Sequence, residues 1–503
     1  MKTTIILFIL CLVSGNAATY YVATTGNNSN SGATGSPWAT IAKGVTNLVA
    51  GDTLIVSNGV FNEYVTVANS GTLANRITVQ AEPIRSVTNL TWNITGSNVT
   101  VRGFVTAGTN VPAFGAGFVI GSTAHYSYLY DNWDHDLVYP RVSYGVSQSG
   151  LTPNTGPSYW CVSNHLAERN AYVVTSTGGQ YGQVRDSHFE GSGNDWMRMK
   201  GGNILIAGNS VTALGTIDAA GHPDFWQIIA QGEETCTNIL IMHNWFTNSA
   251  SQICQMESEY PGKTNDIHHI YSIGNVWYRV DAQAGSLGPR DQIWAYNTMY
   301  EVAPETGFPL PFNGSTSSGV PDRVRILGNM ILNCGGNPST NSEDAYIDIG
   351  LTPTRGWYSY GGSPLPTNVV MAWNYIGGRG PSYTAKSPTG DIFVGNPVIN
   401  GGNPGLVSES TYDLRPLTNS VLIGAGTNLT AMLTSDARFT WFASVYPGIT
   451  NDIIGTPRPS SSQWTIGAFE GGTNAPSGGG GGGSSGPLRV TAQRATIGRI
   501  TGP

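Results

Sequence analysis

Charge is scarce in this sequence. Only 11% of its 503 residues are Asp, Glu, Lys or Arg, against about 25% in an average globular protein. The formal net charge is −7, and the body of the chain has no basic run. We therefore expect no nucleic-acid partner, because a phosphate backbone is bound by clustered Lys and Arg. A polyanionic polysaccharide stays open as a partner, since a local basic groove can exist on an acidic protein.

Cysteine is rare as well. Of the five cysteines, Cys11 lies in the apolar leader, and the others are Cys161, Cys236, Cys254 and Cys334. Four cysteines are too few for a disulfide scaffold in so long a chain, and no spacing resembles a zinc site. We expect Cys254 to pack inside as a small apolar residue. One disulfide among the four stays open.

Long apolar runs are missing after the first residues, so we expect no transmembrane segment. Residues 5–13 form an apolar run that is too short to span a bilayer, and the small residues Ala17 and Ala18 follow it. This arrangement is typical of a secretory signal peptide, which we predict at residues 1–18. The protein is therefore expected to be secreted or held at the cell surface.

Glycine is abundant, with 66 residues, and one motif repeats along the chain. Each copy is a short alternating apolar run, then Asn, then another apolar run, and the copies centre on Asn209, Asn244, Asn275, Asn297, Asn329 and Asn374. Alternation is the pattern of a strand, and Asn suits a bend between two strands. The spacings of 35, 31, 22, 32 and 45 residues indicate stacked coils whose loops differ in length. We expect the Asn side chains to satisfy backbone groups in the bends.

The predicted fold is all-β, a solenoid of roughly a dozen coils with ~4.8 Å between rungs. A helix is expected before the coils, because Ile41, Val45 and Leu48 have helical spacing. Ser36-Pro37 favours a helix start and Gly51 a helix end. A lone amphipathic helix ahead of stacked strands is typical of an end cap, which covers the first coil and blocks edge-to-edge growth.

Several runs carry a resemblance to a known family. They are residues 20–23, 37–41, 51–54, 59–63 and 70–79 near the start, and 412–416 and 464–470 with Asp452, Gly455 and Arg458 near the end. They resemble the cap, first coils and closing segment of secreted pectate-lyase-like proteins, including the chondroitinase-B-like polysaccharide lyases. The resemblance covers residues 19–472. It implies a single-stranded right-handed parallel β-helix domain with an N-terminal helix cap, an architecture that hosts lyases, hydrolases, epimerases, tailspikes and adhesins.

The composition changes after this domain. Residues 473–486 form a Gly/Ser-rich linker that contains six consecutive glycines, and such a linker is flexible. Residues 487–503 form a short tail with Arg489, Arg494 and Arg499 among apolar residues. We expect this tail to be either a sorting or cell-surface attachment tag or a disordered end.

Three segments outside the Asn motif align as successive rungs of one sheet. They are residues 195–200, 224–229 and 252–257. Strand alternation then points Met197, Trp226 and Cys254 inward, together with Met199, Ile228 and Met256. The outward positions form two columns, one of Arg198, Gln227 and Gln255 and one of Lys200, Ile229 and Glu257.

Scarce ionisable groups gather on these rungs and on the loops beside them. Four of the eight histidines, at positions 222, 243, 268 and 269, fall within three coils. His243 precedes a motif Asn, so we expect it to be structural. The remaining groups could serve a lyase that acts on uronic-acid polymers, which must neutralise the substrate carboxylate, remove the α-proton and protonate the leaving oxygen. The catalytic candidates are Lys200, His222, Arg198, Arg290 and Glu257, and possible Ca²⁺ ligands are Asp195, Asp218 and Asp224.

Two further functions fit the same patch. A glycoside hydrolase needs two carboxyl groups ~5–9 Å apart, which Asp224 could provide with Glu257 or Asp195. A surface or tailspike-type adhesin needs only aromatic platforms and hydrogen-bonding groups, and Trp245 and Trp277 are additional platforms. The candidates for binding an extracellular polysaccharide are Trp196, Phe225, Gln227, Gln255, His268 and His269.

Overall fold

The computed structural model of this chain describes most of the predicted domain. The described residues are 17–107, 116–137, 144–148, 156–170, 172–175, 179–193, 195–214, 224–230, 236–249, 252–258, 267–281, 290–302, 310–311, 322–334, 347–348, 368–377, 392–395, 399–400 and 403–471. Most of the predicted signal peptide, the linker and the tail therefore lie outside them. No helix among these residues has the length and apolar character needed to cross a bilayer.

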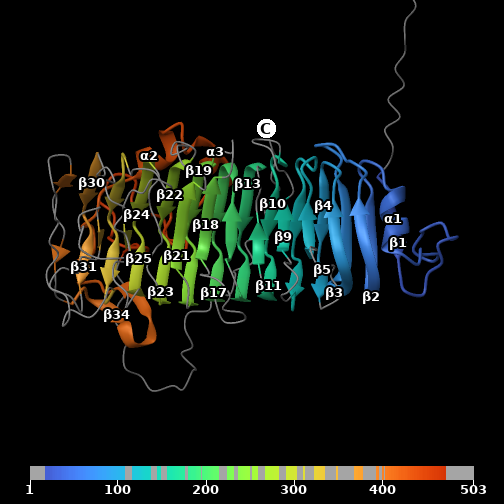
Figure 1. Cartoon of the computed structure of the whole chain (residues 1–503), viewed down its shortest axis with the longest axis horizontal. Helices are drawn as coiled ribbons and strands as arrows, with labels where there is room; N and C mark the ends of the chain where they lie inside the picture. The colour runs from blue at the N-terminus through green and yellow to red at the C-terminus, as the bar shows by residue number, and fades with distance from the viewer. Residues whose placement is uncertain are drawn as a thin grey trace, which may run out of the picture.

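Most described turns of the chain contribute one short strand to each of three parallel faces, and in the turns after residue 258 the described strands form two of these faces. One turn consists of β16 (Gly201–Ala207), β17 (Ser210–Leu214) and β18 (Asp224–Ala230). These strands pair in parallel with their counterparts in the next turn, β19 (Cys236–Met242), β20 (Trp245–Ser249) and β21 (Gln252–Ser258). Within the described ranges, 31 strands join in this way. Figure 1 shows them stacked along the long axis of a rod.

The three faces are called sheets A, B and C. Sheet A contains β1 (Thr19–Val22), β4 (Val99–Arg102), β7 (Tyr128–Tyr130), β10 (Cys161–Ser163), β13 (Gly179–Arg185), β16, β19, β22 (Ile267–Ile273), β24 (Arg290–Ala295), β27 (Arg325–Leu327), β30 (Val369–Ala372) and β32 (Ile392–Gly395). Sheet B contains β5 (Phe104–Ala107), β8 (Trp133–His135), β11 (Leu166–Asn170), β14 (His188–Ser192), β17, β20, β23 (Val276–Val280), β25 (Thr298–Val302), β28 (Met330–Leu332), β31 (Tyr375–Gly377) and β33 (Ile399–Asn400).

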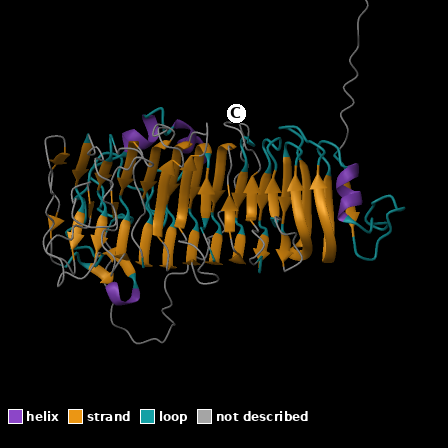
Figure 2. Cartoon of the chain, viewed as in Figure 1, coloured by secondary structure: helices purple, strands orange, loops and turns teal. Residues whose placement is uncertain are grey.

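Sheet C contains β6 (Phe118–Ile120), β9 (Tyr144–Gln148), β12 (Tyr172–Thr175), β15 (Met197–Met199), β18 and β21. Two long strands, β2 (Thr53–Val67) and β3 (Ile77–Ile94), bend through all three sheets. A separate short pair, β26 (Leu310–Pro311) and β29 (Ile347–Asp348), is also parallel. The orange strands of Figure 2 dominate the molecule, which confirms the all-β class and the stacked coils.

Large apolar side chains fill the inside of the coils. Trp92, Trp226, Trp277 and Trp294 are each 0% exposed and belong to one continuous core. All four cysteines after the leader are buried and free, so none forms a disulfide. Cys254 packs inside the core as predicted.

The repeated Asn residues form a ladder at the bend between sheets A and B. All six are 0% exposed. In a typical step, the Oδ1 atom of Asn275 accepts from the backbone N–H and from Nδ2 of Asn244, both at 2.9 Å, and Nδ2 of Asn275 donates to the carbonyl of Ile241 at 2.8 Å. The residue before each Asn has a positive φ, for example 55° at His243. The predicted structural role of the ladder is confirmed.

The N-terminal helix α1 (Ile41–Asn47) lies at the β1 end of the rod (Figure 1). Ile41 and Val45 pack into the core of the first coils. The predicted boundaries are wrong at both ends. The helix begins after Thr40, whose side chain accepts from the backbone N–H of Lys43 at 3.2 Å. The two carboxylate oxygens of Glu63 in β2 accept from the backbone N–H groups of Ile41 and Ala42, at 2.9 Å each. These contacts decide where the helix starts.

Residues 403–471, here called the strap, fold back along the rod. They contain the antiparallel pair β34 (Leu406–Ser408) and β35 (Asp413–Pro416), the 3₁₀ helix η1 (Glu409–Thr411), α2 (Thr430–Ser435) and α3 (Thr440–Val445). One apolar cluster joins the strap to the outer face of sheet A from β16 onward, and a second joins it to sheet B from β20 onward. Figure 1 shows α2 and α3 above β22 and β19.

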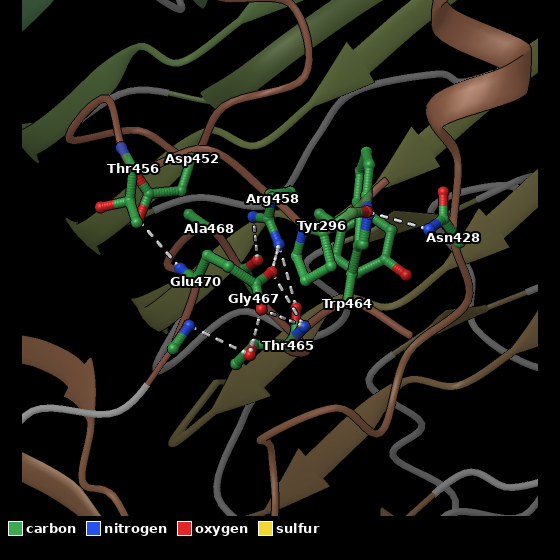
Figure 3. A network of polar contacts seen from close by, with 12 residues as sticks. Tyr296, Asn428, Asp452, Thr456, Arg458, Trp464, Thr465, Gly467, Ala468 and Glu470 are labelled. Atoms are coloured by element: carbon green, nitrogen blue, oxygen red, sulfur yellow. Dashed lines mark hydrogen bonds and ion pairs between the residues drawn. The ribbon is translucent and has the colours of Figure 1, made fainter. Parts of the chain in front are cut away.

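A buried ionic network holds the end of the strap (Figure 3). The guanidinium of Arg458, which is 6% exposed, donates to Oε2 of Glu470 at 2.9 Å and to the carbonyls of Thr465 and Gly467 at 3.1 and 2.8 Å. Asp452 accepts from the backbone N–H of Glu470 at 2.9 Å. Asp452, Arg458 and Glu470 of the predicted closing segment thus form one network.

Candidate functional site

Among the described residues, the two apolar clusters that join the strap to the rod contain residues of sheets A and B and none on the outer face of sheet C. The predicted register is confirmed there. Met197 lies opposite Trp226, and Trp226 opposite Cys254. The other column places Arg198, Gln227 and Gln255 on successive rungs.

Polar contacts link the side chains of this face. Nε of Arg198 donates to Oδ2 of Asp195 at 2.5 Å, and Oδ1 of Asp195 accepts from the backbone N–H of Asp224 at 3.0 Å. Nε2 of Gln227 donates to Oε1 of Gln255 at 3.2 Å. Gln227 is only 4% exposed, so the accessible groups of this column are Arg198 and Gln255.

The predicted aromatic platforms are wrong. Trp196, Phe225 and Trp277 are 0% exposed and Trp245 is 9% exposed. Alternation fails at Trp196 because β15 begins only at Met197, so neighbouring residues both face the core. The rings of Trp196 and Phe225 pack against Phe246, with centroids 5.7 and 4.9 Å apart. These two residues therefore fill the interior and cannot stack on a sugar.

Two of the carboxylates predicted for a metal or for hydrolysis, Asp195 and Asp224, are also buried. Asp195 is 1% and Asp224 is 0% exposed, and both oxygens of Asp195 already accept hydrogen bonds. Among the described residues no group of three His, Cys, Asp or Glu side chains could hold a metal. These residues therefore do not fit a Ca²⁺ site on their own. Asp218, the third predicted ligand, lies outside the described residues.

Three of the catalytic candidates can be only partly placed. His222 lies outside the described residues. Glu257 occupies the rung position opposite Ile229, and its side chain is not described. Lys200 stands between β15 and β16, at the corner where the chain passes from sheet C to sheet A, and is half-buried.

The same corner, one to four rungs further along, holds a group of partly exposed polar residues. They are Thr237, His268, His269, Arg290, Asp291 and Arg323, here called the corner cluster. The register places Thr237 opposite His268 and His268 opposite Arg290. His269 has a φ of 59° and Asp291 of 57°, and this left-handed backbone turns their side chains outward at the corner.

The two histidines share a hydrogen bond. Nδ1 of His268 lies 2.6 Å from Nδ1 of His269 and 2.9 Å from Oγ1 of Thr237. Oδ2 of Asp291 lies 4.0 Å from Nε2 of His269, which favours a proton on that nitrogen. Nδ1 of His269 then accepts, and Nδ1 of His268 donates. This assignment leaves Nε2 of His268 as an unprotonated base.

The surroundings keep the histidines neutral and Asp291 charged. Burial, followed by the neighbouring His269 and Arg290, lowers the pKa of His268 to about 4. Burial also lowers the pKa of His269. The guanidinium of Arg323 donates to both oxygens of Asp291, at 2.6 and 2.8 Å, and lowers the pKa of that carboxyl.

Arg290 has an unsatisfied donor. Its Nε is buried and has no hydrogen-bond partner among the described residues, although the side chain as a whole is half-buried. A buried N–H of an arginine normally has an acceptor. A carboxylate ligand could supply it, because a guanidinium matches carboxylate geometry.

Sequence reasoning missed the parts played by Asp291, Arg323 and Thr237. Asp291 directly follows the predicted Arg290, which was a usable signal. Arg323 could not be found, because the 32 residues that separate it from Asp291 form one turn whose length no local pattern predicts.

No protein-family model matches the sequence, and no curated protein matches it. Its fold is similar to solved structures of three parallel β-helix proteins. XylC in complex with xylose aligns with a TM-score of 0.57 at 13% identity over 90% of this chain and 98% of that one. The chain is a right-handed parallel β-helix protein. Pectate lyase Pel9A aligns to this β-helix with a TM-score of 0.50 at 14% identity over 90% and 96% of the two chains. The PL6 family alginate lyase AlyGC gives 0.51 at 15% identity over 71% and 49%. At these identities the likeness to the β-helix shows the fold alone.

Proposed function

We propose that this β-helix is a polysaccharide lyase that cleaves uronic-acid glycans by β-elimination at the corner cluster. The observation that carries the proposal is the unsatisfied Nε of Arg290 beside an imidazole whose Nε2 is free to accept a proton. The fold is compatible, since a pectate lyase and an alginate lyase share it.

The reaction needs three groups. Arg290 pairs with the substrate carboxylate and disperses the negative charge that develops when the α-proton leaves. Nε2 of His268 accepts that proton, and the electron pair of the C–H bond forms a carbon–carbon double bond as the glycosidic C–O bond breaks. Lys200 at the same corner protonates the leaving oxygen. Arg198 contacts a neighbouring sugar, and His222 and Glu257 stay candidates for the same steps.

The relay behind His268 stabilises the protonated intermediate. As His268 gains a proton at Nε2, it can pass the one on Nδ1 to Nδ1 of His269 across 2.6 Å. The resulting imidazolium lies beside the Asp291 carboxylate, which Arg323 holds in place. Asp291 and Arg323 are therefore positioning residues.

Glycan binding without turnover is the second candidate function. The linked amides of Gln227 and Gln255 and the fixed guanidinium of Arg198 favour it, because rigid hydrogen-bonding groups suit recognition without chemistry. Hydrolysis by Asp224 with a second carboxylate loses support, since Asp224 is 0% exposed.

The test uses purified protein with polygalacturonate and alginate, with and without a chelator. A lyase gives unsaturated products that absorb in the ultraviolet, and His268→Ala should lower kcat by roughly 10²–10⁴-fold. His188→Ala is the matched control, because His188 is exposed on sheet B beside Glu190. New reducing ends without absorbance would support hydrolysis, and neither signal would leave binding alone. Full activity in His268→Ala would overturn the assignment of the base.

Export is part of the proposal. The leader at 1–18 would carry the protein out of the cell to its polysaccharide, and the tail at 487–503 would attach it to the surface. Mass spectrometry of the exported protein should show a start near residue 19, and deletion of 487–503 should release it from cells.

A further inference from the structure

The corner that carries the reaction centre continues along the rod as one file of residues. Successive rungs place Tyr126, Tyr159, Tyr181, Asn203, Asn238, His269, Asp291 and Arg323 at the start of the sheet A strands. Every member has a positive φ, between 55° and 59°. Every member is also partly or fully exposed. The shared conformation aims all of these side chains away from the core along the same edge.

Contacts connect several neighbouring members of the file. The rings of Tyr126 and Tyr159 stack with centroids 4.7 Å apart and an interplanar angle of 2°, and Tyr159 stacks on Tyr181 at 4.7 Å and 6°. Nδ2 of Asn238 donates to Oδ1 of Asn203 at 2.7 Å. The tyrosine rings thus stand on edge, so their rims and hydroxyls face outward while their faces contact each other.

The strap runs beside this file. Trp441 of α3 contacts Tyr181 with centroids 5.4 Å apart and an angle of 68°. Arg438 lies near enough to His269 to lower the pKa of that imidazole. One side of the file is therefore bordered by an indole at the tyrosines and by a cation near the histidines.

We propose that a single acidic glycan chain lies along this file, parallel to the rod axis, with its reacting sugar at His268 and Arg290 and its distal sugars on the tyrosine column. This rests on the proposed function for the reacting end. Five rungs separate His269 from Tyr126, a reach of ~24 Å at ~4.8 Å per rung, so the site takes a polymer and not a disaccharide. Amide and phenol groups spaced one rung apart hydrogen-bond to successive sugars, and Arg290 and Arg438 match their carboxylates.

The test separates binding from turnover. In the His268→Ala background, the triple variant Tyr126→Phe, Tyr159→Phe and Tyr181→Phe removes three hydroxyls and keeps the rings. Affinity electrophoresis in polygalacturonate and alginate gels should show an approximately tenfold weaker Kd, and neutral dextran gels should retard neither protein. Tyr64→Phe is the matched control, since Tyr64 is 55% exposed in β2, away from the file.

Turnover gives the second readout. In the active protein, kcat/KM should rise with oligosaccharide length, and the triple variant should lower the ratio of long-chain to short-chain kcat/KM several-fold. If the triple variant loses gel binding but no form of the protein shows turnover, the lyase proposal is wrong and the proposed glycan-binding file is still supported. Equal gel binding by the triple variant and its background, with an unchanged length ratio, would overturn the file.

Discussion

Removing one rung of the asparagine ladder should destabilise the whole rod. Asn275→Ala deletes an acceptor used by the N–H and the Nδ2 of Asn244, and a donor used by the carbonyl of Ile241. These groups are in a bend that is 0% exposed at Asn244 and Asn275, so water cannot replace the lost partners. Each buried group left unsatisfied costs about 1–3 kcal/mol. Two to three such groups predict a loss of roughly 3–6 kcal/mol in the free energy of unfolding.

Urea unfolding followed by tryptophan fluorescence measures this loss, and amide exchange locates it. The backbone N–H of Asn244 should exchange faster in Asn275→Ala, while the amides of β4 near the other end should change less. Asn47→Ala is the control, because Asn47 is exposed at the end of α1 and should change stability by no more than about 0.5 kcal/mol. A loss below about 1 kcal/mol in Asn275→Ala would refute the reasoning, since the ladder would then be a consequence of the coil geometry and not a support for it.

Three other predictions follow from buried polar groups. Asp134 contacts His165 with both side chains 0% exposed, so Asp134→Ala leaves His165 and Asn170 without their carboxylate acceptor. This should cost about 2–6 kcal/mol of unfolding free energy in urea, at about 1–3 kcal/mol for each buried group left unsatisfied, and a near-neutral result would contradict it. Burial lowers the pKa of His243 from 6.5 to about 3. As the pH falls, the unfolded chain therefore binds a proton at His243 before the folded chain does, and stability should fall between about pH 6.5 and pH 3. In His243→Gln, the melting temperature measured over this range should depend less steeply on pH. Arg458→Met should leave Glu470 without its charged partner and loosen the end of the strap, so limited proteolysis should cut within 403–471 before any coil, and simultaneous cutting of coils and strap would count against it.

Sequence reasoning predicted the coils because their signals are local. A motif Asn in each turn and a two-residue alternation fix the bend and the inward side, and the register of Met197, Trp226 and Cys254 followed from them. It failed at Trp196, because a residue before the first ladder pair does not obey the alternation of the strand that follows. It also failed at Phe225, which lies inside β18 and is 0% exposed like its neighbour Trp226.

The strap could have been anticipated from composition. In β13, Gln183 and Arg185 alternate with Val184, as expected for a strand of a sheet with one solvent-exposed face. In β16, Leu205 lies between Ile204 and Ile206, so both faces are apolar and need cover. The covering segment itself could not be identified, because it lies about 200 residues later and its fit depends on three-dimensional shape.

The strap also sets an order of events. Leu205 and Leu240 meet Leu433, Phe439 and Phe442 only in the completed chain. A growing chain that has already formed β16 to β30 would therefore expose the apolar outer face of sheet A to water until residues 403–471 have been synthesised. Folding of the rod is thus completed only when the strap docks. A partner that covers this apolar face before the strap docks would raise the yield of folded protein.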